Sequence, residues 1–363
     1  MFLIDLLCNQ YFLLFFLVQG CTALYLVRTA VKKCEPLSKT RVQVPALERK
    51  DVKKWNVVEF YVVGFFLLFM RVFMTVGLFV CFCLTTMVIT RKYDLMKPLP
   101  YEVRARCQWW ARWMCRGFLF FAGFMWIDEK DIQVDYSEYL GPNYDKRERP
   151  SLLVSNHSSW VDIILFMYCK YFPSFVSKEV LSKTPLVKVV GRMLNCLYVD
   201  RETSKDNKDK IIQDIIQRQV LMEEGKDKFP LIIYPEGTTS NGFGMMEFKR
   251  GAFVSSKPIK PISVKYRGRN FHPTYEVLPF LSHFVLLHCQ LFSSLEIQYF
   301  PIFVPNDYMY ENTKFKFQDK KELVYGETIR KIIEDNSGIK RTDTTLKDKK
   351  QLLETLYNQK GFN

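Results

Sequence analysis

Short apolar stretches typical of buried strands alternate with helical patterns from about residue 150 onward, and this alternation constrains the fold most strongly. The predicted strands are 151–155, 174–178, 196–199, 231–234, 261–266 and 295–304. A helix is predicted to begin near Ser159, and Lys205–Glu224 gathers its Ile, Val and Leu side chains on one helical face, with Gly225 as a stop signal. This alternation predicts a layered α/β domain with a mixed central sheet flanked by helices.

Two long apolar segments precede this domain. The first, Tyr11–Val27, is about long enough to form a short membrane segment. Asp5 is the only charged residue before Arg28, whereas a cleaved signal peptide usually begins with basic residues. A retained anchor or an interfacial helix is therefore favoured.

The second apolar segment, Val57–Thr90, would form about 51 Å of helix, which is too long for one membrane span. Arg71 lies in its middle and would be costly at the centre of a bilayer. Basic residues flank the segment on both sides and tend to stay in the cytosol, which favours a re-entrant hairpin of two half-helices. A single span from Val72 to Thr90 is the alternative.

Residues 101–127 mix four tryptophans with arginines, namely Trp109, Trp110, Trp113 and Trp126 with Arg104, Arg106, Arg112 and Arg116. Indole rings and long guanidinium side chains suit the headgroup layer of a membrane. A helix that packs on the core and exposes an arginine stripe fits the same pattern.

These features divide the chain into four segments. The predicted segments are an apolar anchor with a basic linker at 1–56, membrane-embedded or interfacial helices at 57–127, the α/β domain at 128–305 and a charged extension at 306–363. Helices are expected in the extension around 318–335 and 344–358.

The net charge of +14 predicts attraction to anionic partners such as nucleic acid, acidic lipid headgroups or a phosphorylated cofactor. Nucleic acid is disfavoured because the basic residues are scattered among apolar segments and no nucleic-acid motif occurs. The ten cysteines include no Cys-x-x-Cys motif, so neither a disulfide framework nor a zinc site is expected.

His157 follows the predicted strand at 151–155, and Asp162 lies five residues further on. A neutral imidazole accepts a hydroxyl proton near neutral pH, and a carboxylate on its other nitrogen orients the ring and stabilises the imidazolium. The pair is therefore a candidate general base with its partner. Ser159-x-x-Asp162 is also a variant of a helix-capping motif, so the alternative role of Asp162 is to hold the start of the helix. No G-x-S-x-G motif indicates a serine nucleophile.

A second polar loop begins at Glu236, directly after the predicted strand at 231–234. Loops at strand ends often carry function in α/β folds, and Gly237 lets the backbone approach a ligand closely. The hydroxyl donors and the cations suited to a phosphate are Thr238, Thr239, Ser240, Lys249 and Arg250. The alternative is a polar turn followed by a solvated charge pair.

Arg201 follows another strand, where it would bind a phosphate or form an ion pair with Asp200 or Glu202. The apolar stretch 277–292 contains His283 and His288 and would suit the lining of an apolar channel. Core packing is favoured for both histidines.

The order of these motifs is more specific than any one of them. Asn-His-x-x-x-x-Asp, Asp-Arg after a strand, Tyr-Pro-Glu-Gly-Thr-Thr-Ser-Asn-Gly and Ile-Lys-Pro-Ile together resemble the four-block pattern of the glycerolipid (1-acylglycerol-phosphate) acyltransferase superfamily. The stretches 289–292, 301–307 and 338–343 look like its lysophosphatidylcholine and lysophosphatidylethanolamine acyltransferase branch. The resemblance covers roughly residues 100–350. Some members of that branch carry EF-hand modules, and none is expected here.

The resemblance implies an enzyme that transfers a fatty acyl group from acyl-CoA to the free hydroxyl of a lysophospholipid or of lysophosphatidic acid. It implies a bilayer-bound protein of the endoplasmic reticulum whose catalytic domain faces the cytosol, with no metal and no cofactor beyond acyl-CoA as co-substrate. His157 would be the general base and Asp162 its orienting partner. The other implied roles are an acceptor pocket shaped by Glu236, Gly237 and Thr238, a phosphate contact from Arg201, and an acyl-CoA side lined by Pro261 and Ile262.

Three other functions fit parts of the pattern. A CoA-independent phospholipid transacylase would use a similar His–Asp pair, and a catalytically silent membrane-binding protein would retain the fold. A metal hydrolase would use His157 and Asp162 as ligands, but further ligands at recognisable spacing are lacking. The headgroup, the acyl chain and the oligomeric state stay open.

Overall fold

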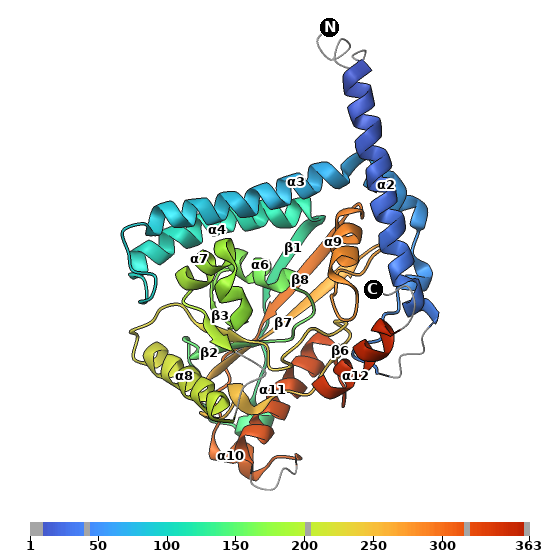
Figure 1. The fold of residues 1–363 in the computed structure, drawn as a ribbon. Coiled ribbons are helices and arrows are strands. Elements are labelled where there is room, and N and C mark those ends of the chain that lie inside the picture. The colour runs from blue at the N-terminus through green and yellow to red at the C-terminus, as the bar shows by residue number, and fades with distance from the viewer. Residues whose placement is uncertain (1–9, 40–43, 200–204, 316–319, 359–363) are drawn as a thin grey trace.

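The structure is a computed structural model that describes residues 10–39, 44–199, 205–315 and 320–358. Within these residues a seven-stranded sheet lies at the centre, with helices on both faces (Figure 1). The strands of this sheet are β1 (Phe124–Asp131), β2 (Leu152–Ser155), β3 (Ser174–Lys178), β4 (Leu197–Val199), β5 (Leu231–Ile233), β7 (Ile259–Gly268) and β8 (Ser293–Tyr299). The helices are α2 (Gln10–Lys39), α3 (Val57–Thr90), α4 (Tyr101–Phe121), α5 (Ser137–Leu140), α6 (Val161–Tyr168), α7 (Pro185–Met193), α8 (Lys205–Glu223), α9 (Phe280–His288), α10 (Asp307–Glu311), α11 (Lys321–Ser337) and α12 (Leu346–Tyr357). The predicted α/β class with a mixed central sheet is confirmed.

The strand order of the sheet is β1-β8-β7-β2-β5-β3-β4, and neighbouring strands are parallel except for the antiparallel pair β7 and β8. β2 lies between β7 and β5, so that Val154 pairs with Pro261 on one side and with Ile233 on the other. The carboxyl ends of β2 and β5 therefore meet at one edge of the sheet, where α/β folds place their functional loops.

Two hydrophobic clusters cover the two faces of the sheet. Leu153 of β2 points into the larger cluster, which contains residues of α4, α6 and α9. Leu152 and Val154 point into the smaller cluster, which contains residues of α11. This alternation follows from the two-residue period of a strand, and it explains why β2 is buried along its whole length.

Several element boundaries match the sequence-based predictions. β3 lies where it was expected, and the helices predicted around 318–335 and 344–358 are confirmed as α11 and α12. The strand predicted at 295–304 ends at Tyr299, because Pro301 has no N–H to continue the strand pairing. The helix expected to begin near Ser159 begins at Val161.

The segment after residue 306 is built into the domain. Its strand β9 (Lys340–Arg341) pairs in parallel with β6 (Gly244–Met245), which lies in the long loop after β5. Arg330 of α11 also donates through Nη2 to the carbonyl of Met245 at 2.9 Å. The C-terminal residues therefore support the loop that begins at Glu236.

α3 is one continuous helix, so the re-entrant hairpin predicted within Val57–Thr90 is wrong. Arg71 does not interrupt it, because its guanidinium donates to the carbonyls of His288, Gln290 and Leu291. These carbonyls lie at the C-terminal end of α9, where a cation is favourable. The chain reverses after Thr90 instead, and α4 returns alongside α3 (Figure 1).

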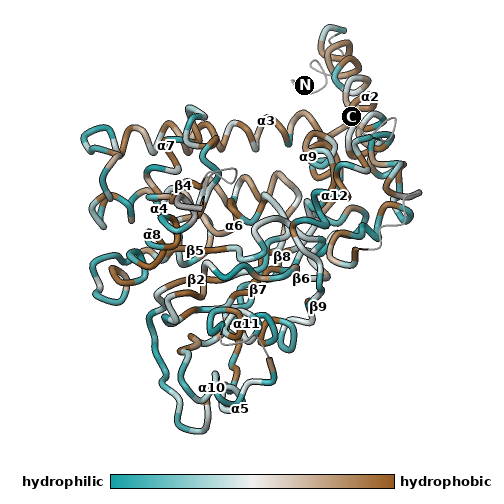
Figure 2. Tube along the Cα trace, turned by 60° about the horizontal axis from the view of Figure 1, so that its bottom comes forward, coloured by the Kyte–Doolittle hydropathy of each residue, from teal (hydrophilic) through white to brown (hydrophobic). Residues whose placement is uncertain are grey.

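α2 and α3 are long and apolar enough to cross a membrane. α3 nevertheless packs one face on the domain, through residues such as Phe60, Leu68 and Phe82. Its opposite face exposes Val58, Val62, Phe66, Phe69, Met70, Phe73, Val76, Leu84, Met87 and Val88. Figure 2 shows hydrophobic residues along α3 and in the projecting half of α2. An exposed apolar face of this kind marks an interaction surface, for a membrane or for another protein.

α4 packs on the core with one face and exposes tryptophans on another, so it has features of both interpretations of residues 101–127. One of its faces packs on α6, while Trp109 and Trp113 are 56% and 63% exposed. Arg104 does not belong to the exposed arginines, because it is buried and donates to Ser174 Oγ at 3.1 Å. Its guanidinium also lies 4.1 Å from the ring centroid of Phe229. The tryptophans face outward, and this arginine joins α4 to the domain.

Candidate active site

Two loops meet at the carboxyl edge of β2 and β5. The loop after β2 carries His157, and the loop after β5 carries Glu236. The His157 amide donates to Glu236 Oε1 at 2.8 Å across a separation of 79 residues. The Ser240 amide donates to the His157 carbonyl at 2.8 Å. The two motifs seen in the sequence therefore form one site.

His157 and Asp162 contact each other directly in this site. Nδ1 of His157 lies 2.7 Å from Oδ2 of Asp162, and the amides of Ser158 and Ser159 donate to the same oxygen at 2.9 Å and 3.1 Å. Asp162 is completely buried, whereas the side chain of His157 is 17% exposed. The carboxylate therefore serves both roles that the sequence left open, since it holds the start of α6 and orients the imidazole.

The imidazole ring is also held by Tyr234. The two rings stack with their centroids 4.1 Å apart and their planes 19° from parallel. Because Nδ1 faces the carboxylate, Nε2 is the ring nitrogen that remains for a substrate proton. A partly exposed imidazole backed by a buried carboxylate is the arrangement that a general base requires.

Glu236 supports the site from within the domain. Its Oε1 accepts the amide of His157, and its Oε2 accepts the amide of Met246 at 2.9 Å. Burial raises the pKa of Glu236 to about 7, against the opposing effect of these two N–H donors. The carboxyl group is 1% exposed, so it shapes the loop without facing a substrate.

Gly237 occupies a backbone conformation that favours glycine. Its φ of +69° is in the left-handed region, and a Cβ there would lie 2.4 Å from Nζ of Lys249. The ammonium group of Lys249 therefore rests against the backbone of this loop. Arg250 follows on the surface, with Nη1 3.7 Å from Glu322 Oε1.

The hydroxyl groups of the loop have different surroundings. The Thr239 hydroxyl donates to the Tyr275 carbonyl, and the Ser240 hydroxyl donates to the His157 carbonyl at 3.3 Å. Both are used inside the protein, which differs from the expectation that they would donate to a ligand. Thr238 is partly exposed in the same loop.

Where the structure describes them, the other predicted site residues make no hydrogen bond to the His157–Asp162 pair. Arg201 falls outside the described residues. Pro261 and Ile262 are buried in β7 beside β2, and Ile262 belongs to the larger hydrophobic cluster. His283 and His288 are both buried, which confirms the prediction of core packing.

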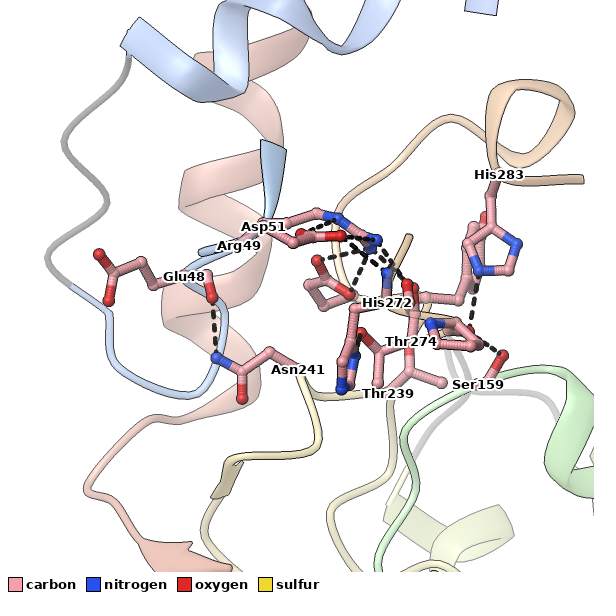
Figure 3. Close-up of polar contacts among 12 residues, drawn as sticks. Glu48, Arg49, Asp51, Ser159, Thr239, Asn241, His272, Thr274 and His283 are labelled. Atoms are coloured by element: carbon pink, nitrogen blue, oxygen red, sulfur yellow. Dashed lines mark hydrogen bonds and ion pairs between the residues drawn. The ribbon is translucent and has the colours of Figure 1, made fainter. Parts of the chain in front are cut away.

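The basic linker before α3 holds the Glu236 loop from outside. Asn241 donates through Nδ2 to the carbonyls of Pro45 and Glu48 at 2.8 Å and 2.9 Å, and the second contact is drawn in Figure 3. The Asn241 amide also donates to the Ala46 carbonyl at 2.8 Å. The linker between the two apolar helices is thereby attached to the site loop.

A buried ion cluster lies beside this attachment (Figure 3). Arg49 pairs with Asp51 at 2.9 Å and with Glu276 at 3.1 Å, and it donates to the Thr274 carbonyl at 2.9 Å. Burial opposes ionisation of Asp51, but Arg49 holds the pKa of that carboxyl below its usual value. The cluster joins the linker to the strand-following loop that contains Thr274.

Three further residues support the site but were not predicted as site residues from the sequence. The Asn156 carboxamide exchanges two hydrogen bonds with the backbone of Val264 in β7, and the Tyr266 hydroxyl donates to Asp162 Oδ1. The only available signal for Tyr266 was that a tyrosine in a buried strand needs a hydroxyl partner. Lys349, the third, had no such signal.

Lys349 connects α12 to the Glu236 loop. Its side chain is buried, and Nζ donates to the Thr239 carbonyl at 2.6 Å and to the Thr239 hydroxyl oxygen at 3.1 Å. α12 therefore holds the backbone of the loop at Thr239, two residues before the linker attachment at Asn241.

Replacing Lys349 with methionine is expected to lower the free energy of unfolding by about 1.5–3 kcal/mol, the typical contribution of a hydrogen bond to a charged group. Thermal or denaturant unfolding measures this loss. The matched control is Lys350→Met, because Lys350 is exposed on the same helix and should change stability by less than about 0.5 kcal/mol. Equal stability of the two variants would contradict the structural role of the Lys349 contact.

The chain is similar to known acyltransferases. The acyltransferase family model matches residues 131–265. Lysophospholipid acyltransferase LPEAT1 of Arabidopsis thaliana is 28% identical over 253 residues, which are 66% of this chain and 61% of that protein. Lysophosphatidylcholine acyltransferase 2 of Homo sapiens is 27% identical over 204 residues, which are 55% of this chain and 35% of that protein.

Among solved structures, the chain is similar to the 1-acyl-sn-glycerophosphate acyltransferase PlsC from Thermotoga maritima. The TM-score is 0.42 with 16% identity, over 75% of this chain and 96% of that chain. The chain spans between about a third and three fifths of the length of the curated relatives named above. Residues 131–265 therefore match the acyltransferase family, and the relatives that the chain resembles over a longer stretch are named lysophospholipid acyltransferases.

Proposed function

We propose that this protein transfers a fatty acyl group from acyl-CoA to the free hydroxyl of lysophosphatidylcholine, lysophosphatidylethanolamine or lysophosphatidic acid. The observation that carries the proposal is the 2.7 Å contact between Nδ1 of the partly exposed His157 and the buried carboxylate of Asp162. The names of the relatives support a lysophospholipid as acceptor.

In the proposed reaction, His157 Nε2 takes the hydroxyl proton while the alcohol oxygen attacks the carbonyl carbon of the thioester. The tetrahedral intermediate then breaks its C–S bond, and the imidazolium returns the proton to the leaving thiolate of CoA. Asp162 stabilises the imidazolium during this cycle. A positioned base contributes about 10²–10⁴-fold, and alignment of two bound reactants contributes about 7–11 kcal/mol. No acyl-enzyme is required.

The loop after β5 would receive the phosphate groups. Lys249 lies against Gly237, so one cation stands next to the residue that precedes the partly exposed Thr238, and Arg250 follows Lys249 on the surface. We propose that Arg201, which follows β4 in the sequence, adds a further cation. Since Pro261 and Ile262 are buried next to β2, their proposed support for the acyl-CoA side would act through packing.

The proposed reaction takes place at a membrane. The open apolar face of α3 and the exposed tryptophans of α4 support attachment to a bilayer, and the net charge of +14 supports attraction to acidic headgroups and to CoA. Basic residues on both sides of α3 favour a catalytic domain in the cytosol. We propose the endoplasmic reticulum as the organelle, by analogy with the branch.

The test is an acyl-transfer assay with purified protein in mixed micelles of detergent and phospholipid. Labelled lysophosphatidylcholine, lysophosphatidylethanolamine and lysophosphatidic acid are supplied separately, each with and without oleoyl-CoA. The proposal predicts labelled diacyl product with at least one acceptor, and only when oleoyl-CoA is present.

The other outcomes separate the remaining functions. Product formed without oleoyl-CoA would indicate a CoA-independent transacylase. A protein that binds the micelles but forms no product with any acceptor would indicate a catalytically silent membrane-binding protein.

A further inference from the structure

The carboxylate of Asp162 is held at both of its oxygens. Oδ2 faces Nδ1 of His157 and accepts the amides of Ser158 and Ser159. Oδ1 accepts the hydroxyl of Tyr266 in a short contact. The phenol and the imidazole therefore lie on opposite oxygens of one completely buried carboxylate.

β7 places Tyr266 at this position. Val264 and Tyr266 are two residues apart and so point to the same face of the strand. Val264 holds the Asn156 carboxamide through its amide at 2.8 Å and its carbonyl at 3.0 Å, directly before His157. The Tyr266 ring is buried and packs edge-on against Phe124, with the ring centroids 5.8 Å apart. One strand therefore holds both ends of the loop that carries His157.

We propose that Tyr266 is a positioning residue for acyl transfer, whose hydroxyl holds Asp162 in line with His157 and limits how strongly the carboxylate retains a proton on the imidazole. This inference rests on the proposed function, and it names a residue of β7 that acts through Asp162 without touching the substrate. Hydrogen bonds from O–H to a carboxylate are short and strong, so this one withdraws negative charge from the oxygen pair that faces His157.

The surroundings of the carboxylate make Tyr266 a donor across the working pH range. Burial raises the pKa of Tyr266 well above its ordinary value, with the negative charge of Asp162 as a further cause, and the pKa of Tyr234, which follows β5, is raised for the same reasons. Both phenols therefore keep their protons. The other titratable groups near the His157–Asp162 pair are Cys169 after α6, Glu236 and Lys249 in the loop after β5, and Arg330 of α11 behind Glu236.

The variant Tyr266→Phe removes the hydroxyl and keeps the ring. The expected result is a fall of about 10-fold in kcat at neutral pH, with the KM values for oleoyl-CoA and for the lysophospholipid changed less than about 2-fold. The acidic limb of kcat/KM should move upward by about half to one pH unit, because the carboxylate then retains the proton on His157 more strongly. A merely structural defect would not move this limb.

The matched control is Tyr299→Phe in the neighbouring strand β8. Tyr299 is also buried, and its hydroxyl donates to a different carboxylate, Glu129 Oε2, at 2.8 Å. It should leave the pH profile unchanged. A third form with 3-fluorotyrosine at position 266 keeps ring and hydroxyl but donates more strongly, so the acidic limb should move to lower pH.

A second readout does not depend on activity. The chain has four histidines, so a sample labelled at histidine Cε1 gives few signals, and the His157 signal is identified by its loss in His157→Ala. Burial lowers the pKa of His272 to about 4, that of His283 to about 3 and that of His288 to about 4. The titration midpoint of the His157 signal should rise in Tyr266→Phe and fall with 3-fluorotyrosine.

The two readouts distinguish the two proposals. If the midpoint shifts while no acceptor is acylated by any form, the proposed function fails and the role of Tyr266 in setting the proton affinity of the pair stands. If acyl transfer is measured but neither the midpoint nor the acidic limb responds to the two substitutions at Tyr266, the inference about Tyr266 is overturned.

Discussion

Replacement of His157 by alanine is expected to lower kcat/KM for acyl transfer by about 10²–10⁴-fold, the contribution of a positioned general base. The imidazole is the group in this site that faces outward while a buried carboxylate holds its Nδ1 at 2.7 Å. Without it the acceptor hydroxyl keeps its proton as it meets the thioester. The measurement is the initial rate of labelled product formation at saturating oleoyl-CoA.

The control for His157→Ala is His272→Asn. His272 contacts Thr274 through Nδ1 at 2.9 Å and packs on Phe243, away from the Asp162 carboxylate. This variant should keep the rate within about 3-fold of the parent protein. A His157→Ala protein that keeps its folded state and the parental rate would exclude His157 as the base.

The second large effect is expected for Asp162→Asn, which should lower kcat by about 10²–10³-fold with little change in KM. The amide has nearly the same shape as the carboxylate but no charge, so the imidazolium formed in the transition state loses its partner. The amide must also meet the hydrogen-bond donors of His157, Ser158, Ser159 and Tyr266, which surround the present carboxylate. Parallel unfolding curves measure how much stability is lost at the start of α6.

A combined variant shows whether the two residues act as one unit. His157→Ala with Asp162→Asn should be about as slow as His157→Ala alone, because the carboxylate acts through the imidazole. Fully multiplicative losses would show that Asp162 has a separate role in the reaction.

The sequence predicted the parts of the fold and site that depend on local patterns. β3 follows from a short apolar stretch, and α8 follows from apolar side chains on one helical face with Gly225 as a stop signal. His157 with Asp162 follows from a strand end and a five-residue spacing. The joining of this pair to Glu236 depends on the parallel pairing of β2 with β5, which the sequence alone did not predict. In a parallel pair of strands, the carboxyl ends meet at one edge.

The parts that escaped prediction depend on contacts between residues far apart in the chain. Tyr266 reaches Asp162 across 104 positions and Lys349 reaches Thr239 across 110, and no local pattern marks either residue. The prediction of a re-entrant hairpin in Val57–Thr90 was wrong for the same reason, because it rested on Arg71. The free-energy cost of burying Arg71 was judged for the centre of a bilayer. In the structure its guanidinium instead donates to carbonyls at the end of α9, which lie 217 or more positions away in the chain.

The pH dependence of kcat/KM in the parent protein and in His157→Ala tests the central claim most directly. If His157 is the general base, the parent shows an acidic limb, and the residual rate of the variant shows no such limb because the titrating group is gone. A variant that retains both the rate and the acidic limb of the parent would contradict the account.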